Sequence, residues 1–163
     1  MGGRTGRVAR RISRDELGAW LLKRNPATGF ELPRAGGVAE SWCVVPGYRS
    51  ELMARGDKVI LWVSGDGRRM VRGIWGLGTV TGPVDREPSV DDHAPAKLVV
   101  PVELVVLGQG VPAGELVAAG ITQLEVQRLP QGSNPSWVSK EQLARLLPLL
   151  PPWPDRERPP TSS

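Results

Sequence analysis

The chain has 163 residues, of which 40% are hydrophobic, and this is enough for one domain with a buried core. Its formal net charge of +4 suggests a polyanionic partner, and no apolar stretch approaches the roughly 18 residues of a membrane-spanning helix. One cysteine and one histidine exclude an internal disulfide and the usual zinc ligand sets, so we expect a cytoplasmic protein without a metal or cofactor.

The two ends of the chain differ in composition from its middle. Residues 1–12 carry four arginines and no acid, which predicts a disordered basic arm, and the apolar stretch of a signal peptide is missing. Residues 151–163 are rich in proline and predict a disordered tail. No repeat or long linker divides residues 13–150, which we expect to form a single domain.

The first half of this domain alternates short apolar runs with turn residues. Ser13 and Glu16 have capping-box spacing, which predicts one helical turn. Strands are predicted at 19–23 and within 36–46, and a helix at 48–54. Two apolar runs flank the sequence SGDGR, and its Asp-Gly pair predicts a β-hairpin over 57–83.

The second half begins with an acidic, proline-bearing segment, 84–97, which predicts a long exposed loop. A strand follows at 98–107, where Pro101 indicates an edge position or a bulge. A short helix closed by Gly120 is predicted at 111–120, and another strand or turn at 121–130. Ser139 and Gln142 predict the start of a helix over 139–147. The sum is an α+β, mainly β fold: a small curved β-barrel with short flanking helices.

Catalytic residues are not apparent in this pattern. The sole histidine, His93, lies beside Asp91 and Asp92 in the acidic loop, where solvated side chains are the simplest interpretation. The glycine-rich stretch 73–78 has neither the dinucleotide nor the P-loop spacing. We therefore expect a binding protein and not an enzyme.

Tryptophan is the conspicuous residue, with six copies against one Phe and one Tyr. A GC-rich genome would produce such an excess without any function, and core filling is the default role for each indole. Trp20, Trp42, Trp62 and Trp75 nevertheless all fall in or beside predicted strands, which is generous for so small a core. We expect one or two of them to line a pocket, where an indole can stack on a planar base or bind a methylated group.

Five segments in order resemble the EVE domain, a PUA-like fold related to the YTH domain. They read AWLLKRNP, SWCVVPGYR, RGDKVILWVSG, RGIWGLGTV and RLPQGSNPSWVSKEQL, and cover roughly residues 16–147. The resemblance implies a PUA-like curved β-barrel whose concave pocket receives one extruded, modified base. YTH domains bind N6-methyladenine in RNA, whereas EVE domains are associated with modified DNA bases such as 5-methylcytosine.

The resemblance also implies roles by position. Asn25 would face the base edge, and Trp42, with Cys43 beside it, would form one wall of an aromatic cage and act as a stacking platform. A clear second cage tryptophan after the hairpin is missing, although Trp75 could replace it, which favours an EVE-type pocket for another base than N6-methyladenine. The expected base pocket comprises Asn25, Trp42, Cys43, Trp62, Ser64, Gly73, Trp75, Ser133 and Asn134. The expected phosphate contacts are Arg24, Arg49, Arg68, Arg69 and Arg72.

We therefore predict a non-catalytic reader of a flipped 5-methylcytosine-type base, in DNA more than in RNA. It would act beside a partner such as a nuclease and away from membranes. Besides a scaffold whose pocket is vestigial, the weakest hypothesis, two alternatives remain open. One is an RNA-binding PUA-like protein in RNA modification or translation. The other is a small enzyme acting on nucleotides or RNA, whose turnover would depend on Asp57 or His93.

Overall fold

The computed structural model describes residues 12–25, 33–64, 70–87, 97–130, 132 and 134–154. Strands and helices alternate irregularly along the chain, as the following bounds show. The elements are β1 (Leu17–Arg24), β2 (Val38–Val44), α1 (Tyr48–Leu52), β3 (Lys58–Val63), β4 (Gly73–Val80), β5 (Asp85–Glu87), β6 (Lys97–Pro112), α2 (Ala113–Ala118), α3 (Glu125–Arg128), β7 (Ser136–Ser139), α4 (Lys140–Leu146) and a 3-10 turn, η3 (Leu147–Leu149).

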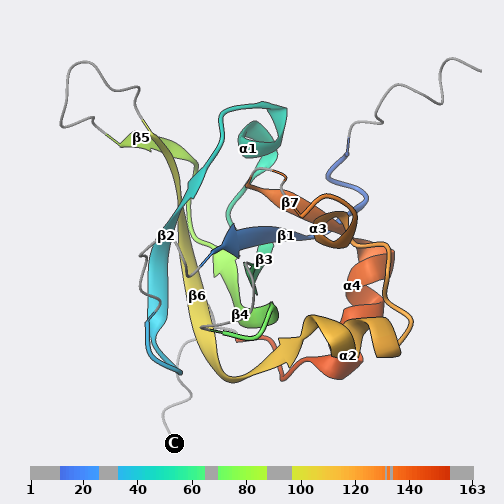
Figure 1. Cartoon of the computed structure of the whole chain (residues 1–163). Helices are drawn as coiled ribbons and strands as arrows, with labels where there is room; N and C mark the ends of the chain where they lie inside the picture. Colours follow the sequence, from blue (N-terminus) through green and yellow to red (C-terminus); the bar gives the residue numbers. More distant parts are fainter. Residues whose placement is uncertain are drawn as a thin grey trace, which may run out of the picture.

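Seven strands form one mixed sheet in the order β2-β6-β4-β3-β1-β7, with β5 paired to β6 (Figure 1). β1 and β3 run parallel, and the other pairings are antiparallel. At one end the N–H of Val45 donates to the carbonyl of Asn134 at 2.9 Å, which brings the two flanks of the sheet together. β2 and β7 are the two ends of the strand order and do not pair over the described residues, and β7 leads directly into α4. The α+β, mainly β prediction is confirmed, whereas the prediction of a closed barrel is wrong.

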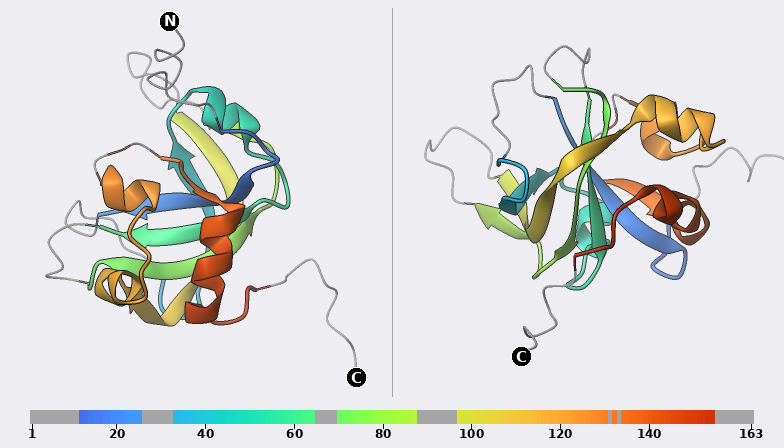
Figure 2. Two further views of the ribbon diagram at one scale, coloured as in Figure 1. Left: turned by 90° about the vertical axis from the view of Figure 1, so that its right-hand side faces the viewer. Right: turned by 90° about the horizontal axis from the view of Figure 1, so that it is seen from below.

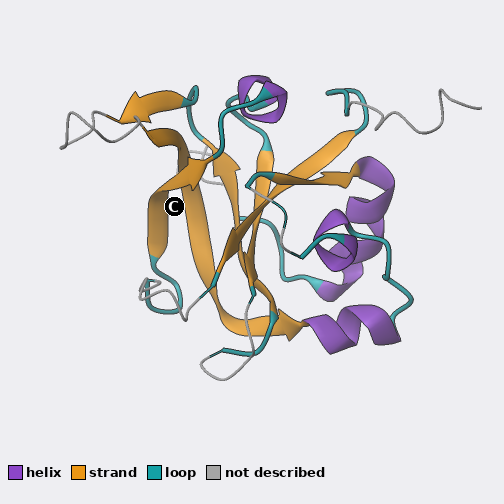
Figure 3. Cartoon of the chain, turned by 45° about the horizontal axis from the view of Figure 1, so that its top comes forward, coloured by secondary structure: helices purple, strands orange, loops and turns teal. Residues whose placement is uncertain are grey.

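The alternation of side chains along the strands divides the core into two layers. Ala19 and Leu21 of β1 point to the face that α2, α3 and α4 cover, and the three helices lie together on that side (Figures 1 and 3). Trp20 and Leu22 point to the opposite face and pack with Trp42 and other side chains of β2, β3 and β6. In the left view of Figure 2, β1, β3 and β4 pass behind α4, so this helix lies across the sheet, and α2 and α3 lie near the strand ends.

β6 is longer than its predicted strand and lies inside the sheet, between β2 and β4. The register of β2 against β6 shifts between Ala39 and Ser41, and Pro101 lies opposite Ser41 at this irregularity. A bulge tolerates a residue that has no N–H to donate. Pro101 is therefore at a bulge, as one of the two predicted alternatives had it, and the edge position is wrong.

The segment 121–130 differs most from the prediction. It forms the short helix α3 in place of a strand or turn, because the side chain of Gln127 accepts from the N–H of Leu124 and donates to the carbonyl of Ile121. β7 was not predicted either. The start of the predicted exposed loop pairs as β5, and the rest of it, residues 88–96 with His93, lies outside the described residues together with the hairpin tip 65–69.

The ordered core extends past both predicted domain boundaries. Ile12 is buried, and Trp153 packs on the helix-covered core and donates from Nε1 to the carbonyl of Gly78 at 2.8 Å. Packing on the core therefore continues as far as Trp153. The rest of the predicted arm and tail, residues 1–11 and 155–163, lies outside the described residues. Among the described residues, no helix is long and apolar enough to cross a membrane.

Candidate functional site

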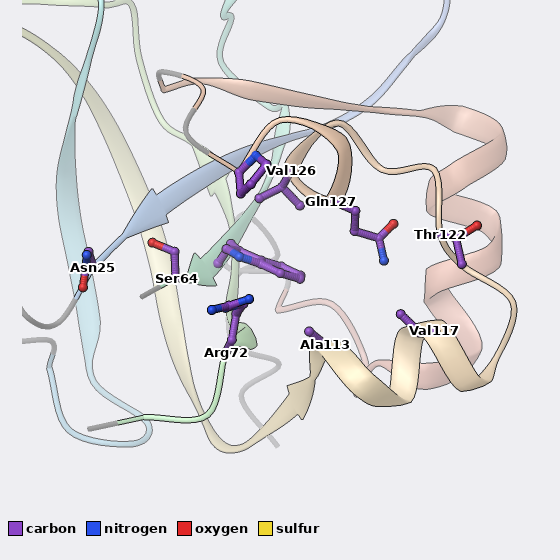
Figure 4. Close-up of a pocket in the computed structure, with 10 residues that line it drawn as sticks. Asn25, Ser64, Arg72, Ala113, Val117, Thr122, Val126 and Gln127 are labelled. Atoms are coloured by element: carbon purple, nitrogen blue, oxygen red, sulfur yellow. The ribbon is translucent and has the colours of Figure 1, made fainter. Parts of the chain in front are cut away.

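A cavity of about 630 Å³ opens where the parallel strands β1 and β3 end (Figure 4). This volume lies within the roughly 300–1,000 Å³ of small-molecule sites. The lining side chains come from both strand ends, the segment before β4, and the helices α2 and α3. They are Asn25, Trp62, Ser64, Arg72, Ala113, Val117, Thr122, Val126, Gln127 and Pro130.

The pairing of β1 with β3 explains why Asn25 and Ser64 meet. Side chains two residues apart on a strand share a face, so Asn25 follows Leu21 on the helix-covered side, and Ser64 follows Trp62 there. The N–H of Ser64 donates to the carbonyl of Arg24 at 2.8 Å, which extends the parallel pairing beyond β3. Trp62 is only 3% exposed, so its indole is fixed by the core and presents a small part of its surface to the cavity.

The opposite wall is built by two short helices. Val117 of α2 and Val126 of α3 supply apolar surface. Gln127 has its amide engaged with the backbone of residues 121 and 124, so it is a fixed part of this wall. Figure 4 shows Val117, Thr122 and Gln127 on one side of the cavity and Asn25, Ser64 and Arg72 toward the other.

Arg72 is the single charged residue among those that line the cavity in the described part of the chain. Its guanidinium, with the Asn25 carboxamide and the Ser64 hydroxyl, gives the polar side both donors and acceptors. With the indole of Trp62 nearby, the site suits a flat, polar ligand that carries or adjoins negative charge.

Four predicted contact residues therefore lie together, namely Asn25, Trp62, Ser64 and Arg72. Gly73, another expected pocket residue, directly follows Arg72, but its contribution is to the path of the backbone. Its φ is 151°, and a Cβ there would lie 2.1 Å from the carbonyl oxygen of Val111. This glycine allows β4 and β6 to approach closely.

Trp42 is not at this cavity. Its side chain is 2% exposed in the core on the other face of the sheet, and Cζ of Arg24 lies 4.8 Å from its ring centroid. The guanidinium covers the indole through a cation–π contact, and burial lowers the pKa of Arg24. Trp42 thus lies in the core on the face away from the cavity, which corrects its expected role as a stacking platform. Arg24, an expected phosphate contact, is half-buried on that same side of the sheet. Cys43 is exposed on the other side of β2.

Three more expected contact residues have structural partners. Trp75 donates from Nε1 to the carbonyl of Val71 at 2.7 Å and does not line the cavity. The Asn134 side chain binds the backbone of Lys23, accepting from its N–H at 2.7 Å and donating to its carbonyl at 3.1 Å. Arg49 pairs with Glu125 through two contacts of 2.5 and 2.8 Å, so its charge is matched within the protein.

Ser133, Arg68 and Arg69 lie outside the described residues. None of the residues of the opposite wall, from Ala113 to Pro130, was predicted to line the site. Gln127 was the available signal, because a glutamine three residues after a helix N-cap is half of a capping box.

Asp57, the carboxylate of the enzyme alternative, is fully engaged. It accepts from Arg14 at 2.6 and 2.9 Å, from Nε1 of Trp20 at 2.9 Å and from the N–H of Ala54 at 2.9 Å. Burial acts to raise its pKa, but the hydrogen bonds from Arg14, Trp20 and Ala54 together outweigh burial and hold the pKa below the usual range. In the described ranges, no group of three or more His, Cys, Asp and Glu residues is placed to hold a metal ion.

Comparison with known proteins supports the fold alone. No protein-family model matches the chain, and no curated protein matches it. The chain is similar to the NMR structure of Rpa0253 from Rhodopseudomonas palustris, with a TM-score of 0.54 and 18% sequence identity over 78% of this chain and 89% of that one.

Proposed function

We propose that this chain is a non-catalytic nucleic-acid-binding module with a PUA-like fold, and that its cavity accommodates one flipped, modified base. The observation that carries the proposal is the convergence of Asn25, Trp62, Ser64 and Arg72 on one cavity. These residues come from three separate segments, and each was expected from the sequence to contact a base or a phosphate.

The chemistry of the cavity suits a nucleobase. The Asn25 carboxamide can donate to and accept from the hydrogen-bonding edge of a base, and the Ser64 hydroxyl can do the same. Trp62 lines the cavity where Trp42 does not, and because it is only 3% exposed it can contact a base with part of its ring edge and cannot serve as a stacking platform. Arg72 supplies a cation for a phosphate beside the extruded nucleotide. Extrusion costs a few kcal/mol, which contacts of this kind offset.

The apolar wall supplies selectivity for a modified base. Val117 and Val126 offer space in which an added methyl group would be buried. A methyl group in such a pocket is worth about 1–3 kcal/mol. The resemblance to EVE domains favours 5-methylcytosine or a derivative in DNA, read beside a partner nuclease, with RNA as the competing polymer.

The proposal is tested by titrating the protein with short oligonucleotides. The panel carries one central cytosine, 5-methylcytosine, 5-hydroxymethylcytosine, adenine or N6-methyladenine, in DNA and in RNA. We expect one modified base to bind more tightly than its unmodified parent, and Asn25→Ala to remove that preference. Arg72→Gln should weaken binding to all members similarly and reduce the salt dependence. Arg145→Gln, an exposed site on α4, serves as the matched control.

Equal, steeply salt-dependent binding to every oligonucleotide would contradict the proposal. The arginines would then hold phosphate without any reading of the base.

A further inference from the structure

The wall of the cavity formed by α3 belongs to a longer segment that side chains of other elements hold in place. We call the described residues of 124–135 the α3 strap. The strap contributes Val126, Gln127 and Pro130 to the cavity. Its helix has four residues, far fewer than the roughly 12–15 at which an isolated helix becomes marginally stable. The position of this wall therefore depends on contacts with other elements.

The first anchor is the ion pair between Arg49 of α1 and Glu125, the first residue of α3. Nη1 of Arg49 donates to Oε1 of Glu125 at 2.5 Å, and Nη2 donates to Oε2 at 2.8 Å. Nη1 also donates to the carbonyl of Pro135 at 3.3 Å, so one guanidinium joins both ends of the strap. The side chains are 29% and 11% exposed, which protects the pair from much of the screening at a surface.

The second anchor is Lys23, near the end of β1. Its side chain is buried, and its ammonium donates to the carbonyl of Gly132. Burial lowers the pKa of Lys23, the negative charge of Glu125 opposes this effect, and the positive charge of Arg49 adds to it. Asn134 completes the attachment through its two hydrogen bonds to the Lys23 backbone. Lys23 thus attaches the strap to β1, and it lies two residues before Asn25, which lines the cavity.

We infer that Arg49 and Glu125 are positioning residues, which fix the α3 strap so that the cavity is formed before its ligand arrives. This inference rests on the proposed function of the cavity and gives Arg49 a role other than phosphate contact. A preformed wall spares the ligand the cost of ordering the strap when it binds. Loss of the ion pair should therefore weaken binding although every residue that lines the cavity remains.

Hydrogen exchange on the full chain tests the inference without a ligand. In Arg49→Gln, the amides of Gln127, Arg128 and Leu129, which bond within α3, should exchange about tenfold faster than in the wild type. Glu125→Gln should have a larger effect, because it leaves the cations of Arg49 and Lys23 without their carboxylate. Arg49→Lys keeps the positive charge but cannot bind both carboxylate oxygens of Glu125 as a guanidinium does, and it should give an intermediate exchange rate. Arg145→Gln is the control.

The binding arm uses the DNA oligonucleotide with a central 5-methylcytosine. Arg49→Gln should raise its Kd about threefold to tenfold, and Arg49→Lys should recover part of that loss. The inference is overturned by unchanged exchange in the strap, by faster exchange spread equally over β1, β3 and β4, or by faster strap exchange with an unchanged Kd. If the wild type shows no preference for any base, the proposed function fails, and the exchange result separately decides whether the ion pair holds the wall.

Discussion

The carboxylate of Asp57 offers the sharpest quantitative prediction, because it accepts hydrogen bonds from donors that differ greatly in burial. Nε1 of Trp20 and the N–H of Ala54 both donate to Oδ2, and the Trp20 side chain is completely buried. An indole N–H left unpaired there costs about 1–3 kcal/mol. The Arg14 fork binds both oxygens, but its side chain is 45% exposed, so it contributes at most about 1 kcal/mol.

Two substitutions separate these contributions. Asp57→Asn can keep an oxygen at the Oδ2 position for Trp20, Ala54 and Nη1 of Arg14, and it loses the negative charge and the acceptor for Nη2 of Arg14, so we expect a loss of about 1 kcal/mol or less. Asp57→Ala removes every acceptor and should cost about 2–5 kcal/mol. The free energy of unfolding is measured by urea titration, followed by circular dichroism, with the exposed Asp85→Ala as the control. Equal losses in the two Asp57 variants, or a loss below about 1 kcal/mol for Asp57→Ala, would refute this reasoning.

Three further outcomes are expected. Because the folded-state pKa of Asp57 is lowered, its stabilisation is complete above the unfolded value of about 3.9 and disappears as the pH falls through the folded value. The difference in unfolding free energy between the wild type and Asp57→Asn should therefore shrink below about pH 4, and a constant difference down to pH 2 would contradict this. Gly78→Ala should cost at least about 3 kcal/mol, because its Cβ would lie 1.8 Å from the carbonyl oxygen of Glu103. Gly114→Ala in α2, with open space around the new Cβ, should stabilise by about 0.5–1 kcal/mol; a thermal melt showing similar shifts for both would refute the packing argument. Trp153→Ala should lower the free energy of unfolding, measured by urea titration, by about 1–2 kcal/mol. An unchanged value would show that this indole does not hold the chain against β4.

Local chemistry made much of the fold predictable. The apolar runs of β1, β3 and β4 are long enough to identify the strands. The helix α4 was predicted from a capping box that the structure shows in full, with the Ser139 hydroxyl accepting from the N–H of Gln142 at 3.1 Å and the Gln142 side chain accepting from the N–H of Ser139 at 3.0 Å. α3 offered only half of such a signal, Gln127, because its N-cap is Leu124, and its four residues are held by Arg49, which is distant in sequence.

The site was predictable where the parallel pairing of β1 with β3 is regular. Trp62 of β3 and Ser64, which directly follows β3, share a face, and the end of β1 brings Asn25 beside them. Trp42 was assigned to the pocket by its position in a resembling segment, and such a position does not fix the face of a strand. The register irregularity between Ala39 and Ser41 lies just before this tryptophan, and a shift of one residue exchanges the two faces.

The measurement that tests the central claim most directly is an NMR titration of the six indole N–H signals, each assigned by a Trp→Phe substitution. The ligand is the modified oligonucleotide that binds best in the panel. We predict that the Trp62 signal shifts most, while the signals of Trp42 and Trp20 change little. The largest shift at Trp42, or small uniform shifts at all six signals, would contradict the placement of the base in the cavity between β1, β3 and α3.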